Sequence, residues 1–255
     1  MNWLGVAALA AIVAAGQIAR AQDIDIDVLP YASGGKIVTG GIDHATGNII
    51  TESQTVFDGG MDNNGVSVTT DEPGYDNNVS NQSDTTHHLT PNGNLHFSIL
   101  PNSFSNSRVG YWDGNGAVSW SDVASGFSVT VTSQANPSNT VTYDGSASTA
   151  TDGFDIKSML DAQGRLHEHM DTFFPLNAPT GLYLLTYRLS SSSLNSADPI
   201  SIVLNYGASD AASDAAVAAV PEPGSVTLAG FGAMGLLLRS RRRRDGANDR
   251  AGHAR

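Results

Sequence analysis

Short runs of alternating apolar and polar residues are the dominant pattern in this chain, and they predict a protein built mainly from β-strands. The run 23–28, Asp-Ile-Asp-Ile-Asp-Val, alternates strictly, which predicts a strand with aspartates on one face and Ile/Val on the other. Comparable runs predict further strands at 36–39, 49–57, 66–70, 94–100, 127–132, 140–143, 165–170, 182–189 and 200–205.

Segments rich in Gly, Asn, Asp and Pro separate these runs, among them DGGMDNNG, DEPGYDNN, PNGN and WDGNG, and all are typical of turns. No amphipathic helix longer than about ten residues is predicted before Ala208. Many short strands at this spacing predict an all-β domain at 22–207, an antiparallel β-sandwich of Ig-like or jelly-roll-like type. The Ala-rich segment 208–220 is interpreted as a terminal helix, with Ser209 and Asp210 as candidate N-caps, or as a linker.

The N-terminal segment 1–21 has the pattern of an export signal. It runs apolar from Trp3 to Gly16 and then reaches Ala19 and Ala21, a small-x-small cleavage site. The apolar run is shorter than the ~20 residues of a membrane span. We therefore predict cleavage by signal peptidase, with an uncleaved anchor as the alternative.

The C-terminal segment 221–244 has three parts in a fixed order. The triplet Pro221, Glu222 and Pro223 comes first. An apolar helix predicted at 225–238 follows and includes Leu228, Phe231, Leu236, Leu237 and Leu238. The third part is a basic cluster made of Arg239, Arg241, Arg242, Arg243 and Arg244. The helix would span only ~21 Å of a ~30 Å hydrocarbon core, and its arginines would keep residues 245–255 in the cytoplasm.

This arrangement closely resembles the PEP-CTERM sorting signal of bacteria. The resemblance implies recognition of the Pro-Glu-Pro triplet by an exosortase, a membrane-bound transpeptidase-like protease. It also implies transient membrane anchoring, followed by transfer to the cell surface or the extracellular matrix. The tail beyond the arginines departs from the usual pattern, and an ordinary single-span anchor is the alternative.

Charge and cysteine content narrow the range of partners. Between Gln22 and Val220 the chain holds 22 Asp and Glu against 5 Lys and Arg, a formal charge of about −17. Such a surface repels nucleic acid and anionic lipid, which are bound through phosphate neutralisation, and it favours divalent cations. The absence of cysteine excludes disulfides and thiolate-bound zinc.

The segment LHEHMD, residues 166–171, is the densest group of candidate metal ligands. In a strand, His167, His169 and Asp171 share one face, where two imidazoles and a carboxylate suit one cation. In a helix the segment imitates a zinc-protease motif, but Asp171 stands where that motif needs a second histidine. A polar, exposed strand without metal is the third interpretation.

Three further histidines strengthen the metal hypothesis. The segment 85–97 holds His87, His88 and His96, and its Pro-Asn-Gly-Asn turn predicts a hairpin that brings His96 beside the other two. Imidazole nitrogen with carboxylate support favours zinc. Calcium is the runner-up, because the Asp/Asn-rich turns at 58–65 and 71–78 offer oxygen ligands but lack an EF-hand pattern.

A second resemblance covers most of the body from Asp23 onward. The segments HHL, GYWDGNG, LHEHMD, PTGLYLLTYRLSS and DPISIVLNYG resemble a family of exported PEP-CTERM proteins repressed by the zinc uptake regulator. They are similar, more loosely, to surface-anchored domains with an H-x-H motif. The resemblance implies a zinc-responsive surface protein, with His167, His169 and Asp171 matching its H-x-H-x-D segment and His87 and His88 its paired histidines.

No nucleophile elbow, phosphate loop, dinucleotide fingerprint or complete zinc-protease motif occurs in the sequence. We therefore predict a non-enzymatic protein of the surface or extracellular matrix that binds zinc. The alternatives are a structural or adhesive module without metal, which would contact extracellular polysaccharide, and a metal-dependent hydrolase.

Overall fold

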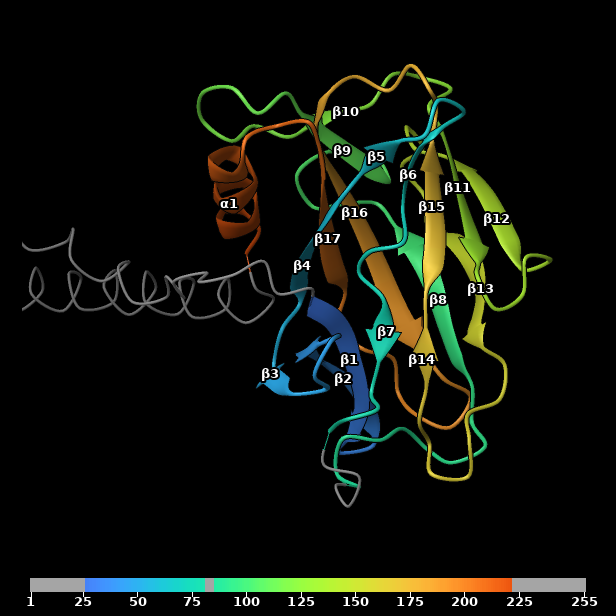
Figure 1. Ribbon diagram of the computed structural model, residues 1–255. Coiled ribbons are helices and arrows are strands. Elements are labelled where there is room, and N and C mark those ends of the chain that lie inside the picture. The colour runs from blue at the N-terminus through green and yellow to red at the C-terminus, as the bar shows by residue number, and fades with distance from the viewer. Residues whose placement is uncertain (1–25, 81–84, 222–255) are drawn as a thin grey trace, which may run out of the picture.

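The computed structural model describes residues 26–80 and 85–221, and strands dominate it (Figure 1). The strands form three sheets, and none of the three closes into a barrel. The predicted signal peptide at 1–21, the apolar segment at 225–238 and the tail at 245–255 lie outside the described residues.

The N-terminal sheet contains the first strand of the domain and the short strand that carries His167, with one strand between them. Its order is β14 (His167–Glu168), β7 (Tyr75–Asp76), β1 (Ile26–Ser33), β2 (Lys36–Asp43) and β3 (Ile49–Thr51). The hairpin β1–β2 is joined by eight antiparallel residue pairs. The link from β1 to β7 is parallel and has one registered pair, Val28 with Tyr75.

Two further sheets, of seven and five strands, contain the remaining strands. The central sheet contains β10 (Ser121–Asp122), β9 (Val109–Trp112), β16 (Gly181–Ser190), β17 (Ile200–Tyr206), β4 (Val56–Gly60), β8 (Leu95–Leu100) and β13 (Thr151–Lys157). The outer sheet runs in the order β12 (Thr140–Asp144), β11 (Ser128–Ser133), β15 (Met170–Phe174), β6 (Val68–Thr70) and β5 (Asp62–Asn63). Most neighbours are antiparallel, as predicted, but β4 joins β17 in parallel.

The main core lies between the central and outer sheets and extends to the N-terminal sheet, whose Val28, Ile37 and Tyr75 belong to it. On β16, Tyr183, Leu185 and Tyr187 point into this core and meet residues of β11 and β15. The ring of Phe174 on β15 lies 5.0 Å from that of Tyr183, measured between centroids, so side chains of the two sheets interdigitate. This arrangement agrees with the predicted all-β sandwich.

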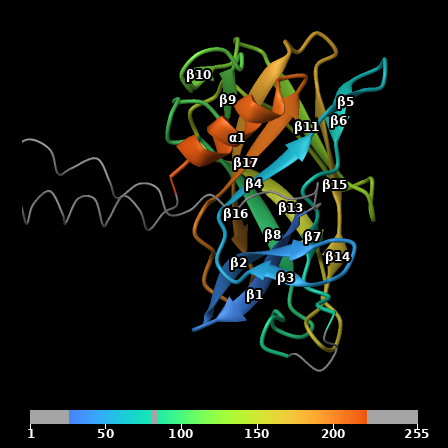
Figure 2. The same ribbon diagram turned by 60° about the vertical axis from the view of Figure 1, so that its left-hand side comes forward.

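The helix α1 (Asp210–Ala219) covers the opposite face of the central sheet, as Figure 2 shows where it comes forward across β17. Its Ala212 and Ala216 pack with Leu182 and Leu184 of β16, which is why β16 is buried on both faces. Ser209 is the N-cap, so the helix interpretation of 208–220 is confirmed. Among the described residues, no helix is both long and apolar enough to cross a membrane.

Several local predictions need correction. The predicted hairpin at 85–97 does not form, because β8 pairs with β13 on one edge and with β16 on the other. The strand expected at 49–57 is divided into β3 and β4, and the turn segment at 71–78 contains β7. The pattern also missed β13, whose glycine and aspartates weaken its alternation and whose pairing with β8 is broken by bulges.

Candidate metal centre

The strand interpretation of LHEHMD agrees with the structure. Leu166, Glu168 and Met170 are buried, whereas His167 and His169 lie on the other, more exposed face. Glu168 turns inward and pairs with Lys157. Strand alternation therefore places the two histidines on the same side of the chain.

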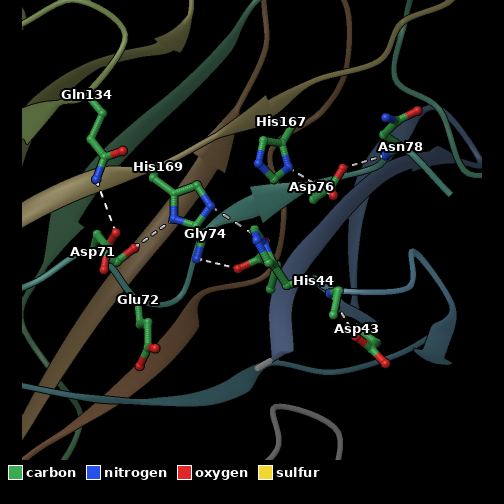
Figure 3. A network of polar contacts seen from close by, with 12 residues as sticks. Asp43, His44, Asp71, Glu72, Gly74, Asp76, Asn78, Gln134, His167 and His169 are labelled. Carbon is green, nitrogen blue, oxygen red and sulfur yellow. Dashed lines mark hydrogen bonds and ion pairs between the residues drawn. The ribbon is translucent and has the colours of Figure 1, made fainter. Parts of the chain in front are cut away.

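Two residues from the N-terminal hairpin complete the cluster. Asp27 projects from β1 with a fully buried side chain, and His44 follows directly after β2. One ligand atom from each of Asp27, His44, His167 and His169 lies within 4.8 Å of the others. The three imidazole ring centroids are 5.2–5.3 Å apart, which forms a nearly equilateral triangle (Figure 3). These four residues form a group that can hold one metal ion.

Gly74 provides the space in which these side chains meet. Its backbone N–H donates to Asp27 Oδ1 at 2.6 Å, which leaves the other carboxylate oxygen directed at the imidazoles. That oxygen, Oδ2, lies 2.9 Å from His44 Nδ1 and 4.0 Å from His169 Nε2. A Cβ at Gly74 would stand 2.6 Å from both Asp27 Oδ1 and His169 Cε1. Only glycine leaves this corner open.

Hydrogen bonds outside the cluster orient two of the rings. His167 Nδ1 lies 3.0 Å from Asp76 Oδ2, and His169 Nδ1 lies 3.2 Å from the carbonyl oxygen of Asp71. Both partners accept, so each neutral imidazole carries its proton on Nδ1 and presents the lone pair of Nε2. A carboxylate or carbonyl behind a ligating histidine is the usual support of metal-bound imidazole.

A tight turn presents His44. The side chain of Asp43 accepts hydrogen bonds from the backbone N–H groups of Ala45 and Thr46, at 2.9 and 3.2 Å. Hydrogen bonding from the Thr46 side chain, and then from the turn backbone, lowers the pKa of Asp43 below its ordinary value. The Asp43 carboxylate therefore stays charged and holds the turn from which His44 projects.

The charge of Asp27 also favours a cation. Within residues 26–80 and 85–221, the ion pairs of Asp27 are with His44 and His169 only, and no lysine or arginine contacts it. A fully buried carboxylate without a permanent positive partner is costly. A divalent cation bound by the four residues would supply that positive charge.

Of the residues predicted as ligands, the structure brings His167 and His169 together and places the other four elsewhere. The ring of His87 is tilted against that of Tyr31 and its Nε2 lies 3.7 Å from Glu52 Oε1, while His88 is buried and its carbonyl accepts from the N–H of Ala32 in β1. Both ring nitrogens of His96 are taken by carboxylates, Asp155 at 3.0 Å and Asp152 at 2.9 Å. His96 is not brought beside His87 and His88, because β8 pairs with β13 and β16 and the predicted hairpin does not form.

Asp171 shares the face of His169 but belongs to a different environment. Between Glu168 and Met170 the chain leaves the N-terminal sheet and joins the outer sheet, which carries Asp171 away from the cluster. Its carboxylate accepts from Gln134 at 2.7 Å. It lines an open depression of about 430 Å³ together with Asp62, Asp71 and Glu72.

Asp27 and His44 were missed by the sequence reasoning, and for different reasons. The alternation of 23–28 predicts Asp27 on a strand face shared with other aspartates, which gives no sign that this side chain is fully buried beside three imidazoles. His44 stands alone in a turn, where it gives no local signal. Asp27 and His44 are 140 and 123 positions from His167 along the chain. Because of this separation, only the tertiary structure shows that they lie beside His167.

Comparison with known proteins identifies one region. The family model of the PEP-CTERM protein-sorting motif matches residues 219–243, in agreement with the resemblance noted in the sequence. No curated protein matches the chain.

Proposed function

We propose that this chain, which carries a PEP-CTERM sorting motif and is thereby marked for export and exosortase processing, is a non-enzymatic, metal-binding protein of the cell surface or extracellular matrix. Zinc is the expected metal, and Asp27, His44, His167 and His169 are the expected ligands. The observation that carries the proposal is the convergence of four ligand atoms within 4.8 Å of one another. Two of the imidazoles are also held by hydrogen bonds from Nδ1 to acceptors outside the cluster.

The donor set favours zinc over calcium. Three imidazole nitrogens and one carboxylate oxygen make a typical tetrahedral zinc shell, whereas calcium takes six to eight oxygen ligands. Copper and nickel also bind imidazole, so the order of affinities is part of the test. Four protein ligands would fill a tetrahedral shell and leave no position for a reacting water, which supports binding rather than catalysis.

Calorimetric titration with zinc tests the proposal. The three hydrophobic clusters of the core lie within residues 28–220, so the chain shortened to residues 22–221 keeps every residue of these clusters. We expect one zinc per chain, bound more tightly than about 100 μM, roughly 5.5 kcal/mol. Calcium should give no comparable heat.

The matched variants are His167→Ala with His169→Ala, and His87→Gln. The double variant should abolish binding, while His87→Gln, which changes a histidine outside the cluster, should bind zinc as the unchanged chain does. Binding that survives the double variant, or no binding at all, would leave a structural or adhesive module as the better description.

A further inference from the structure

We propose that the metal works as a cross-link that fastens the open end of the N-terminal hairpin β1–β2 to the rest of the domain. This inference rests on the proposed function and concerns what the bound metal does for the protein. The hairpin supplies Asp27 and His44, and the chain around β14 supplies His167 and His169.

The two ends of the hairpin are held differently. Its turn end is held by the loop before β17. The N–H of Ile37 donates to the carbonyl oxygen of Asn195, and the N–H of Asn195 donates to the carbonyl oxygen of Gly35. Lys36 also forms an ion pair with Asp198 at 3.0 Å. The metal cluster lies at the opposite, open end, where Ile26 pairs with Asp43 and Asp27 with Ile42. The turn end is therefore held by hydrogen bonds and an ion pair, without a metal.

At the open end, few residue pairs join the hairpin to β14. The strand β7 between the two halves has two residues, with one registered pair to β1 and two to β14. The N–H of Val28 donates to the Gly74 carbonyl at 2.9 Å, and Gly74 N–H donates to Asp27. The four ligands lie on both sides of this narrow strand, so a bound metal would join β1 to β14 across it.

The contribution of such a cross-link is set by the metal affinity and the free metal concentration, because the metal binds the folded chain and is released when the hairpin opens. Asp27 and His44 are 123 to 142 positions from His167 and His169, so the unfolded chain does not hold the four ligands together. The chain has no cysteine, so disulfides are excluded and a metal is the available cross-linker.

Without the metal, the open end should separate more readily from β7. Among the described residues, the buried carboxylate of Asp27 then faces imidazoles and no lysine or arginine, and β1 is joined to β7 by a single registered residue pair. Local opening of this kind exposes backbone amides and draws Val28 out of the main core, most of which lies between the other two sheets and stays folded.

Hydrogen-exchange mass spectrometry on the chain of residues 22–221, with zinc and with chelator, tests this inference. At free zinc near 100 Kd, amides of β1, the end of β2 and β7 should exchange about 100-fold more slowly, because opening must first release the metal. Over exchange times too short for global unfolding, amides of β16 and β17 should change little, because they do not open with the hairpin. His44→Gln should remove the protection, whereas His87→Gln should keep it.

The outcomes separate the two proposals. If calorimetry shows one bound zinc but exchange at β1, β2 and β7 is unchanged, the cross-link is wrong and the metal site stands. Equal slowing in all three sheets would also overturn the cross-link, since it would indicate general stabilisation. If zinc does not bind, both proposals fail.

Discussion

The Nδ1 atom of His167 and the Oδ2 atom of Asp76 lie 3.0 Å apart across the two-residue pairing of β14 with β7. Asp76 is buried, and its other oxygen accepts the backbone N–H of Asn78 at 2.6 Å. The carboxylate is therefore fixed, and it fixes the ring of His167 in turn. This contact would give the proposed metal centre a rigid support that does not depend on the metal.

Replacing Asp76 tests that support. Asp76→Ala should weaken zinc binding about 10- to 100-fold, because the His167 ring loses the acceptor that holds its orientation and proton position. Calorimetric titration measures the change. Asp58→Ala, which alters an aspartate outside the cluster, is the control. An unchanged Kd for Asp76→Ala would show that His167 does not depend on this carboxylate.

Gly74→Ala should abolish zinc binding and destabilise the fold. The added Cβ would lie 2.6 Å from Asp27 Oδ1 and from His169 Cε1, and the segment must shift to relieve the clash. We expect a loss of about 1–3 kcal/mol in the free energy of unfolding, measured with urea. Gly60→Ala is the matched control, since its Cβ would meet only Glu72 Oε2 at 3.9 Å. Normal zinc binding by Gly74→Ala would contradict the proposed position of the metal.

His96→Gln tests whether His96 supports the fold without taking part in metal binding. His96 joins β8 to β13 through Asp152 and Asp155, well away from the metal ligands. Its loss should lower the free energy of unfolding by about 0.5–1.5 kcal/mol and leave the zinc Kd unchanged. A weaker zinc affinity in this variant would mean that His96 takes part in metal binding after all.

The buried tyrosines predict sensitivity to alkali. Burial raises the pKa of Tyr187 to about 12, and burial also raises the pKa of Tyr75 and Tyr143 well above their ordinary value. The unfolded chain ionises its tyrosines near pH 10, so above that pH it binds fewer protons than the folded protein. The free energy of unfolding should therefore fall as pH rises from 10 to 12, by about 1.4 kcal/mol per unit for each such tyrosine.

Urea unfolding between pH 8 and about pH 11 measures this slope. Tyr187→Phe should make the slope shallower by the share of one tyrosine. The hydroxyl of Tyr187 has no hydrogen-bond partner among the described residues, so its removal should cost little at neutral pH. A stability that is constant up to pH 11 would contradict the burial of these hydroxyls.

Strand positions were largely readable from the sequence because alternation is a local property. The runs at 182–189 and 200–205 became β16 and β17 within a residue or two, and the alternation of Leu166 to Met170 correctly placed His167 and His169 on one face. The burial of β16 on both faces was not readable, because α1 covers one of them from a distant part of the chain.

The sequence by itself determined the β-rich character of the body, the shared face of the two histidines and the sorting motif, since each depends on neighbours in the chain. The tertiary structure alone decided which groups join those histidines. It placed Asp27 and His44 beside them, moved Asp171 into another sheet, and left His87, His88 and His96 apart. The physical reason is that a metal site needs atoms close in space, and here the backbone path through three sheets, not spacing along the chain, sets those distances.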